Sequence, residues 1–345
     1  MKIRVGLLVG YDGSRYHGLQ FNKDLDTVEK KIVECLLRMD AISERNAGDP
    51  RKIHIKSSSR TDKGVHAALN LVSVKIELGV SPELVSGLRE LLSKEGIHLY
   101  DIVRLTKSIV PSKQAISRTY EYIVPTYFLA EGDFSREVEV LSQGDEECRG
   151  DRIGRVYPES MIDSVVGYTS SEDDTRVFST ILQKYVGTKD FHNFTKLNNE
   201  KGSTRYIKSI IVSDAYTDNG VEYVKISITG QSFLLHQIRK MVLFAVLLCR
   251  YSRNAVDSKF DMVFSRHNIH VPKGPSEYLL LDKPIFHKLR RGDGTTEHIG
   301  VSDSDREEYK RSTIYPRIHE RKNLTSFFAC MDSVRFHREN IVFID

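Results

Sequence analysis

The sequence predicts an α+β protein built from two similar halves. Short stretches of alternating apolar residues, typical of strands, are interleaved with longer stretches whose apolar residues recur at helical spacing. Hairpin-length turns such as Asp218-Asn219-Gly220 join some of the strands, which together indicate the α+β class. With 345 residues, of which 40% are hydrophobic, the chain is long enough for two domains with a sizeable core.

In the first half we expect strands at residues 3–9, 53–56, 68–78, 97–105 and 118–125. Helices are expected at residues 27–42 and 81–93. Thr27 suits the N-cap of the first helix, whose apolar residues form one stripe, and Pro82 suits the first turn of the second.

In the second half we expect helices at about 175–185, from Phe233 onward and at about 254–265, and strands at 206–216 and 222–229. Residues 131–160 are polar and lack periodicity, so they are expected to form an insertion or long connection. Residues 290–308 are rich in Gly, Asp and Thr and are expected to be mobile. The predicted segments are 1–130, 131–172, 173–290 and a C-terminal extension, 291–345.

Composition excludes several classes of protein. The 51 Lys and Arg residues exceed the 47 Asp and Glu residues by only four, so a nucleic-acid binder would have to gather its cations on one face. The four cysteines lie far apart without CxxC spacing, and the twelve histidines form no ligand-like cluster, so we expect neither a disulfide framework nor a metal site. No apolar run reaches membrane-spanning length, and residues 1–4 lead directly into a predicted strand, so we expect no signal peptide.

The most informative stretch is SSRTDKGVHA at residues 58–67. It places the carboxylate of Asp62 between the cations Arg60 and Lys63, with a permissive Gly64 after them, on a connection between two predicted strands. Scaffolds often mount reactive groups on such connections. From spacing alone, a surface loop with an internal ion pair is an equally good interpretation.

Five sequence blocks, in order along the chain, resemble the motifs of one enzyme family. Besides residues 58–67, they are GYDG at 10–13, SRTYEY at 117–122, GTKDFHNFT at 187–195 and GQSFLLHQIRKMV at 230–242, with an apolar run ending in Asp282 near the end of the second half. The family is that of the tRNA pseudouridine synthases related to bacterial TruA, and the resemblance is strongest to the eukaryotic multisite-specific type. It spans roughly residues 3–290 and continues weakly at 314–316. Lys189 stands where many relatives carry histidine.

The resemblance implies two ferredoxin-like (RRM-like) halves whose antiparallel sheets join around a central catalytic cleft, with a helical C-terminal extension. It also implies an RNA-modifying isomerase that acts on tRNA, with small nuclear RNA and mRNA as further candidate substrates. We expect a monomer in the nucleus, with the cytoplasm as the alternative. The rival interpretations are a synthase restricted to the tRNA anticodon arm and a non-catalytic RNA-binding protein on the same scaffold.

The chemistry of this reaction suggests particular residues. Pseudouridine forms when the C1′–N1 bond of uridine breaks, the uracil turns and a C1′–C5 bond forms. No electrons or carried groups are exchanged, so we expect no cofactor, and no metal. The reaction needs a carboxylate that attacks or stabilises the sugar or base, and Asp62 is the candidate.

Arg239 and Tyr120 are the other catalytic candidates. Arg239 lies on an almost continuously apolar helix, where a buried guanidinium needs an anion, and we expect it to pair with Asp62. The alternative is that it reaches solvent or binds a backbone carbonyl. Tyr120 is expected to stack the uracil and relay a proton, although two core tyrosines, Tyr120 and Tyr122, would fit the same strand.

The target base must be flipped out of folded RNA, which requires further contacts. Arg60 is placed to enter the vacated stack or hold the adjacent phosphate. The weaker candidates for RNA contacts are Lys63, His66, Lys189, Gln231 and His236. Each of these could also be an ordinary surface or helix-entry residue.

Overall fold

The structure, a computed structural model, describes residues 2–132, 159–196, 202–287, 289–290, 296–297 and 299–335. It is α+β with mixed strand pairing, which confirms the predicted class. By their contacts the residues fall into two units. Unit 1 comprises Met1–Tyr120 with Leu279–Ile318, and unit 2 comprises Glu121–Tyr278 with His319–Asp345. The division differs from the four expected segments, because the chain returns to unit 1 at Leu279.

The sheet of unit 1 is built around its two longest strands, β1 (Ile3–Tyr11) and β3 (His66–Ile76), which pair antiparallel. On either side lie β4 (Ile97–Leu105) and the two-residue β2 (Lys56–Ser57), giving the order β4-β1-β3-β2. β10 (Leu279–Phe286) runs parallel to β3, so the sheet is mixed.

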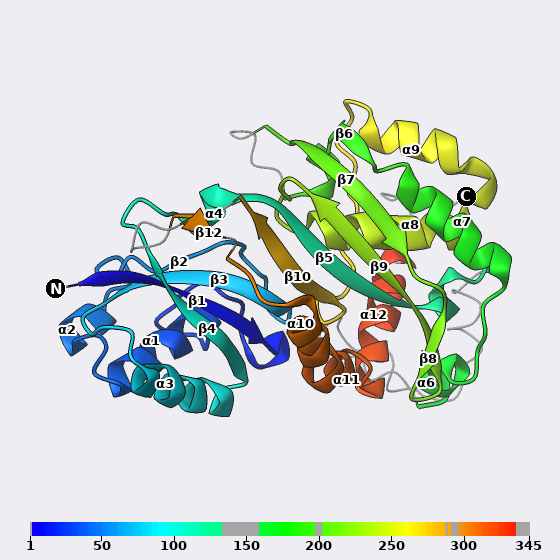
Figure 1. Ribbon diagram of the computed structural model, residues 1–345. Coiled ribbons are helices and arrows are strands. Elements are labelled where there is room, and N and C mark those ends of the chain that lie inside the picture. The colour runs from blue at the N-terminus through cyan, green and yellow to red at the C-terminus, as the bar shows by residue number, and fades with distance from the viewer. Residues whose placement is uncertain are drawn as a thin grey trace. The chain divides into compact units, whose positions relative to one another are not determined.

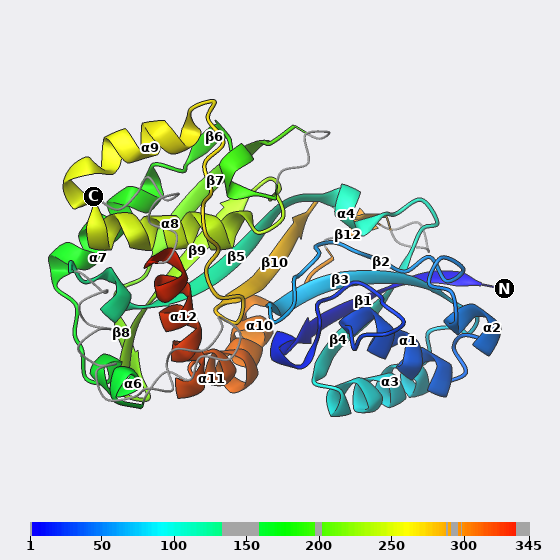
Figure 2. The same cartoon turned by 180° about the vertical axis from the view of Figure 1, so that it is seen from behind.

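Helices α1 (Val28–Arg38) and α3 (Pro82–Lys94) pack in unit 1 (Figures 1 and 2). Each begins after a hydroxyl residue, Thr27 or Ser81, whose side chain accepts a hydrogen bond from an amide of the first turn. α3 packs against β4. The shorter helices of this part of the chain are α2 (Glu44–Ala47), α4 (Pro111–Gln114) and the 3₁₀ turn η1 (Gly13–Arg15).

The chain returns to unit 1 after β10 and packs against β3. This segment contains α10 (Asp303–Tyr309), the π-helical η6 (Lys310–Ile314), α11 (Tyr315–Ile318) and the short strands β11 (Leu289–Arg290) and β12 (Thr296–Glu297). The ring of Tyr309 lies directly over Gly10 of β1, where a Cβ atom would come within 2.5 Å of a ring carbon. Glycine at position 10 therefore allows this segment to approach the strand.

Unit 2 has an antiparallel sheet of β9 (Val221–Gly230), β7 (Thr204–Val212) and β6 (Gly187–Asp190), with β8 (Tyr216–Asp218) paired to β9. β5 (Ala115–Pro125) neighbours β9 and begins in unit 1.

Helix α8 (Gln237–Tyr251) is the most buried helix of unit 2 and packs against α7 (Glu172–Gln183). The others are α6 (Glu159–Val165), α9 (Val256–Phe264), α12 (Leu324–Arg335) and the turns η2 (Thr126–Leu129), η4 (His192–Phe194), η5 (Arg253–Ala255) and η7 (Arg321–Asn323). α12 is fixed by Phe327, which stacks on Phe128 with ring centroids 4.9 Å apart. No helix among the described residues is long and apolar enough to cross a membrane.

Most predicted elements are confirmed within a few residues, and four predictions are wrong. Residues 53 and 54 form a turn in place of a strand, with His54 at φ 51°. The strand expected at 206–216 is interrupted between β7 and β8. α8 begins at Gln237, after His236 at φ 63°, and not at Phe233. Residues 303–308, expected to be mobile, belong to α10. The insertion expected at 131–160 lies mostly outside the described residues.

Replacing Gly10 by alanine should destabilise the protein by about 1–3 kcal/mol, the usual range for overpacking. The new methyl group would lie 2.5 Å from the Tyr309 ring and 2.8 Å from the carbonyl oxygen of Ala68, and that backbone atom cannot easily move. Urea unfolding measures the effect. Gly79→Ala is the matched control, because nothing lies within 4 Å of its Cβ position. Equal stabilities for the two variants would show that Tyr309 does not pack on β1 as described.

Candidate active site

Asp62 lies half-buried on the short loop that connects β2 to β3. The backbone on either side of the carboxylate is fixed: the amide of Leu19 donates to the carbonyl of Thr61 at 3.1 Å, and the amide of Val65 donates to the carbonyl of Asp62, also at 3.1 Å. Gly64 has φ +80°, a conformation that glycine adopts without strain. The prediction that Asp62 lies on a connection between two strands is confirmed, although β2 has only two residues.

A buried polar network holds the loop from beneath, and its centre is the side-chain amide of Asn70 on β3. Its Oδ1 accepts from the hydroxyl of Ser58 at 2.6 Å, and its Nδ2 donates to the carbonyl of Ser59 at 2.9 Å and to the Tyr11 hydroxyl at 3.3 Å. The Tyr11 hydroxyl is in turn 2.9 Å from Oγ1 of Thr61. Asn70 and Tyr11 are fully buried on the sheet. Of the four residues before Asp62, they hold three by hydrogen bonds: Ser58, Ser59 and Thr61.

Sequence analysis missed this network. Its signal was present, because Asn70 is a polar residue on a strand face that is otherwise apolar. A buried polar side chain normally has hydrogen-bond partners. The sequence does not reveal those partners, since Tyr11 is 59 residues away.

Tyr120 lies on β5 in the same unit as Asp62 and is 8% exposed. The pKa of its phenol is raised to about 12, mainly because the side chain is buried. The Ser59 hydroxyl and the Arg118 guanidinium oppose the shift, and the negative charge of Asp62 adds to it. Tyr120 is therefore a neutral phenol at physiological pH, close enough to Asp62 to sense its charge. Tyr122, by contrast, is a core residue whose hydroxyl donates to the carbonyl of Pro275 at 2.7 Å.

Arg239 lies in the first turn of α8 and is 9% exposed. Its Nε donates to the carbonyl of Gly274 at 2.7 Å, so one part of the guanidinium binds backbone, as the alternative interpretation of the sequence held. Asp62 and Tyr120 belong to unit 1 and Arg239 to unit 2. The pairing of Arg239 with Asp62 stays a prediction.

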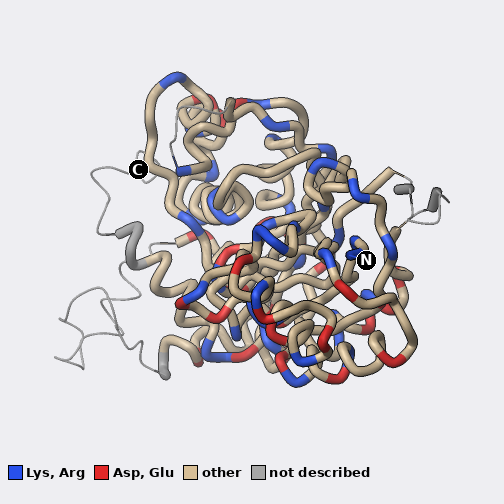
Figure 3. Tube along the Cα trace, turned by 90° about the vertical axis from the view of Figure 1, so that its left-hand side faces the viewer, with Lys and Arg blue, Asp and Glu red and all other residues tan. Residues whose placement is uncertain are grey.

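The candidate RNA-binding residues differ in exposure. Arg60, Lys63 and Gln231 are exposed, whereas Lys189 and His236 are partly buried. The ammonium of Lys189 lies 5.6 Å from the centre of the Phe264 ring. Figure 3 shows basic and acidic residues interspersed along much of the chain trace, in agreement with the small net charge.

His66 requires a correction. It is fully buried at the start of β3, where the amide of Gly13 donates to its Nδ1 at 3.1 Å and the Asp12 carboxylate lies 3.2 Å from the same nitrogen. Burial opposes ionisation of Asp12, but the neighbouring His66 ring and the hydrogen bonds from the amide and hydroxyl of Ser14 outweigh it and lower the pKa of that carboxyl to about 2. A ring with no exposed surface cannot contact RNA, so His66 supports the fold of the 12–14 turn.

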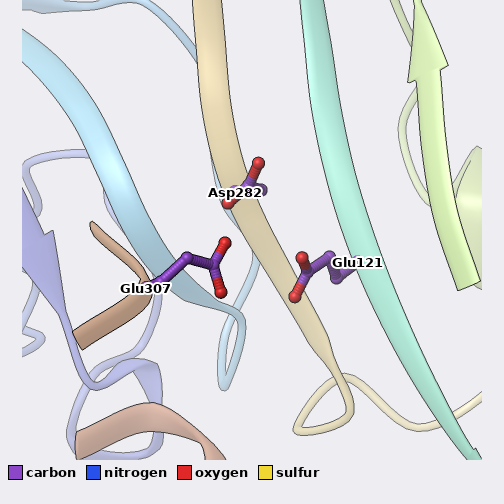
Figure 4. A group of neighbouring side chains, drawn as sticks. All are labelled: Glu121, Asp282 and Glu307. Atoms are coloured by element: carbon purple, nitrogen blue, oxygen red, sulfur yellow. The ribbon is translucent and has the colours of Figure 1, made fainter. Parts of the chain in front are cut away.

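A second polar cluster surrounds Asp282, which ends the apolar run of β10. Figure 4 shows its carboxylate together with that of Glu307 on α10. The fully buried ammonium of Lys310 lies 3.0 Å from Asp282 and 2.5 Å from Glu307, and Nε of Arg306 donates to Asp282 at 2.8 Å.

Two carboxylates so close together could hold a divalent cation by their donor chemistry. In this cluster, however, the ammonium of Lys310 already bonds to both carboxylates, and Arg306 adds a second positive charge. Glu121, also drawn in Figure 4, belongs to unit 2 and lies 3.8 Å from the ammonium of Lys225. The cluster in unit 1 is therefore an internal ion-pair network that fastens α10 and η6 to β10.

Comparison with known proteins gives consistent results. A family model described as tRNA pseudouridine synthase matches residues 181–286. The chain is 30% identical to tRNA pseudouridine synthase 1 of Kluyveromyces lactis, an alignment that covers 96% of this chain and 70% of that protein. It is 34% identical to the tRNA pseudouridine(27/28) synthase of Saccharomyces cerevisiae, covering 81% and 83%. It is 27% identical to tRNA pseudouridine synthase 1 of Schizosaccharomyces pombe, covering 95% and 82%.

Asp282→Ala should lower the free energy of unfolding by about 3–5 kcal/mol, because it leaves the buried cations Arg306 and Lys310 without their shared anion. Asp303→Ala is the control: this carboxylate also pairs with Arg306, at 2.6 Å, but is 76% exposed, so its loss should cost at most about 1 kcal/mol. Dialysis against a chelator should leave the unfolding temperature unchanged. A fall on metal removal, reversed by added metal, would show that the carboxylates hold a cation.

Proposed function

The chain belongs to the tRNA pseudouridine synthase family, and we propose that it is an isomerase that converts specific uridines of tRNA to pseudouridine. The observation that carries the proposal is the family match together with Asp62, held on a loop whose preceding residues are hydrogen-bonded to the sheet. A non-catalytic RNA-binding protein would not need a carboxylate positioned in this way.

Asp62 supplies the proposed catalytic carboxylate. In the reaction, the C1′–N1 bond breaks, the detached uracil turns, and C5 forms the new bond to C1′. The hydrogen on C5 is then lost as a proton, while N1 gains one, so the product has the same atoms as the substrate. A carboxylate can promote the first step by attacking or by stabilising the positive charge that develops on the sugar. Fixing the backbone of residues 58–62 holds that carboxylate in place without reorganisation.

Tyr120 and Arg239 are the proposed partners of Asp62. The neutral phenol of Tyr120 offers a ring for stacking the uracil and a hydroxyl that can relay the proton from C5. Arg239 would keep Asp62 ionised and aimed through a charge-assisted hydrogen bond. Its position on the rigid, buried helix α8 supports this role, because the guanidinium cannot move freely into water.

Arg60 is the proposed residue that fills the gap left by the flipped base or holds the adjacent phosphate. It is the exposed member of an otherwise buried sequence, Ser58 to Thr61, two residues before Asp62. Lys63, Lys189, Gln231 and His236 are further proposed RNA contacts, and their partial or full exposure supports them.

We propose that each half of the protein has a ferredoxin-like fold. In unit 1 the chain order β1-α1-β2-β3-α3-β4 and the sheet order β4-β1-β3-β2 support it. In unit 2 the support is the order β5-α7-β7-β9-α8, with β9 between β5 and β7. We also propose that the protein is a monomer located in the nucleus and that it acts on small nuclear RNA or mRNA as well. The alternative activity, restricted to the tRNA anticodon arm, remains a proposal too. So does the division of the chain into the segments 1–130, 131–172, 173–290 and 291–345.

Asp62→Ala and Asp62→Asn should lower pseudouridine formation in tRNA on the order of 10³-fold or more, as expected for a catalytic group. The affinity for tRNA should stay near that of the unmodified protein, because phosphate contacts dominate binding. Product mapping and filter binding measure the two quantities. Asp24→Ala, on the exposed turn before α1, is the control and should keep full activity. Turnover near the normal rate in Asp62→Ala would reject the assignment.

A further inference from the structure

A cavity of about 880 Å³ lies in unit 2 beside the start of α8, and its charge is one-sided. Its charged and titratable lining, apart from Cys330, consists of three lysines and three histidines: Lys196, Lys240, Lys273, His192, His236 and His270. No aspartate or glutamate is among the described residues that line it. In a chain whose total charge is nearly balanced, this is a local concentration of positive charge, and such concentrations attract anions.

Lys240 is fixed at the wall of this cavity. Its ammonium donates to the carbonyls of Asn193 and Thr195, at 3.2 and 3.1 Å. Burial, together with the positive charge of Lys273, lowers the pKa of Lys240 to about 8. An anion in the cavity would oppose both effects, because it would compensate the charges of the two lysines and replace lost solvation.

The walls of the cavity are rigid. Asn193, 3% exposed, joins two of them: its Nδ2 donates to the carbonyls of Val263 and His267, at 2.8 and 2.9 Å, and its Oδ1 accepts from the amide of Ile269 at 2.8 Å. The segment that carries Lys196 and the segment that carries His270 are therefore held together before any ligand binds. A site assembled in advance loses less entropy on binding.

The positive end of α8 adds to this field. The helix has 15 residues, and its N-cap residue, His236, has φ 63° and makes no side-chain hydrogen bond to the first-turn amides. The helix macrodipole places about half a positive charge at such an end, which favours an anion. His236, just before the helix, and Lys240, in its first turns, both line the cavity.

We infer that this cavity binds a backbone phosphodiester of the tRNA substrate. The inference rests on the proposed function, which makes RNA the substrate. Lysines, imidazoles and helix amides are the groups that commonly hold phosphate. The volume exceeds what a single inorganic ion needs, so the cavity has room for the flanking sugar. A metal site fits less well, because the histidines and Cys330 form no group of three whose ligand atoms lie within 4.8 Å among the described residues.

A phosphate held here would also help to position the RNA. Arg239, the proposed partner of the catalytic acid, lies between His236 and Lys240 on the same helix. An RNA phosphate bound by His236 and Lys240 would therefore be held next to α8, the helix that carries Arg239. The phosphate contact would then set which nucleotide is presented for flipping.

The salt dependence of tRNA binding tests the inference. The double variant Lys196→Ala/Lys273→Ala removes two exposed lining lysines, so folding should be preserved, and melting measures that directly. The inference places one phosphodiester in the cavity, so losing that contact in the double variant should make the slope of log K against log salt shallower by about 0.7 to 0.9. Lys94→Ala/Lys322→Ala removes the same charge from exposed positions outside the cavity and should change the slope by less than one contact.

Equal slopes and affinities for the lining variant and the unmodified protein would overturn the inference, as would an equal loss in the control. Titration with inorganic phosphate completes the test. Tight phosphate binding with unchanged tRNA affinity in the lining variant would assign the cavity to free phosphate and reject an RNA contact. These readouts measure binding alone. A protein that binds tRNA through the cavity but forms no pseudouridine would therefore contradict the proposed function and leave this inference standing.

Discussion

The position of the candidate catalytic carboxylate depends on one buried side-chain amide. Asn70 binds Ser58, the carbonyl of Ser59 and the hydroxyl of Tyr11, and through Tyr11 it reaches Thr61. The residues that make these hydrogen bonds are buried, and an unsatisfied polar group there costs about 1–3 kcal/mol. The network is therefore stable only when all its members are in place, and that condition fixes the loop that ends in Asp62.

The rest of unit 1 packs around the sheet that carries this network. α1 packs against α3 and α3 against β4, while the segment after β10 covers Gly10 with Tyr309. That segment is fastened by the buried pairs of Asp282 with Arg306 and Lys310. The pairs bring fully buried cations into the protein, and such groups are tolerated only with a well-placed anion. The apolar run that ends in Asp282 therefore has a structural role in this chain.

Local patterns predicted much of the fold. Alternation located β1, β4 and β9, and hydroxyl residues before apolar stripes located the starts of α1 and α3, because these signals depend on neighbouring residues only. The start of α8 was placed four residues too early, since the left-handed conformation of His236 is not expected of a non-glycine residue. The parallel pairing of β10 with β3 joins residues more than 200 positions apart, and no local pattern carries that information.

The candidate site was predictable to a similar degree. The motif around Asp62 identified the loop, since its charges and glycine are adjacent in sequence. His66 was misassigned because exposure is set by tertiary packing: the same block of residues holds an exposed Lys63 and a fully buried His66. The cationic cavity beside α8 could not be found from sequence, because its lysines come from three separate segments.

The central claim is that the Asn70 network positions Asp62, and the turnover of Asn70→Leu tests it most directly. This variant keeps the number and branching of the side-chain heavy atoms and removes the hydrogen bonds. Ser73→Ala, on the same buried strand, is the control, because it removes a hydrogen bond to Lys56, outside residues 58–62. Well below both melting temperatures, kcat per folded molecule should fall about tenfold to a hundredfold in Asn70→Leu. It should stay normal in Ser73→Ala, with tRNA affinity unchanged in both. A normal kcat in folded Asn70→Leu would contradict the account.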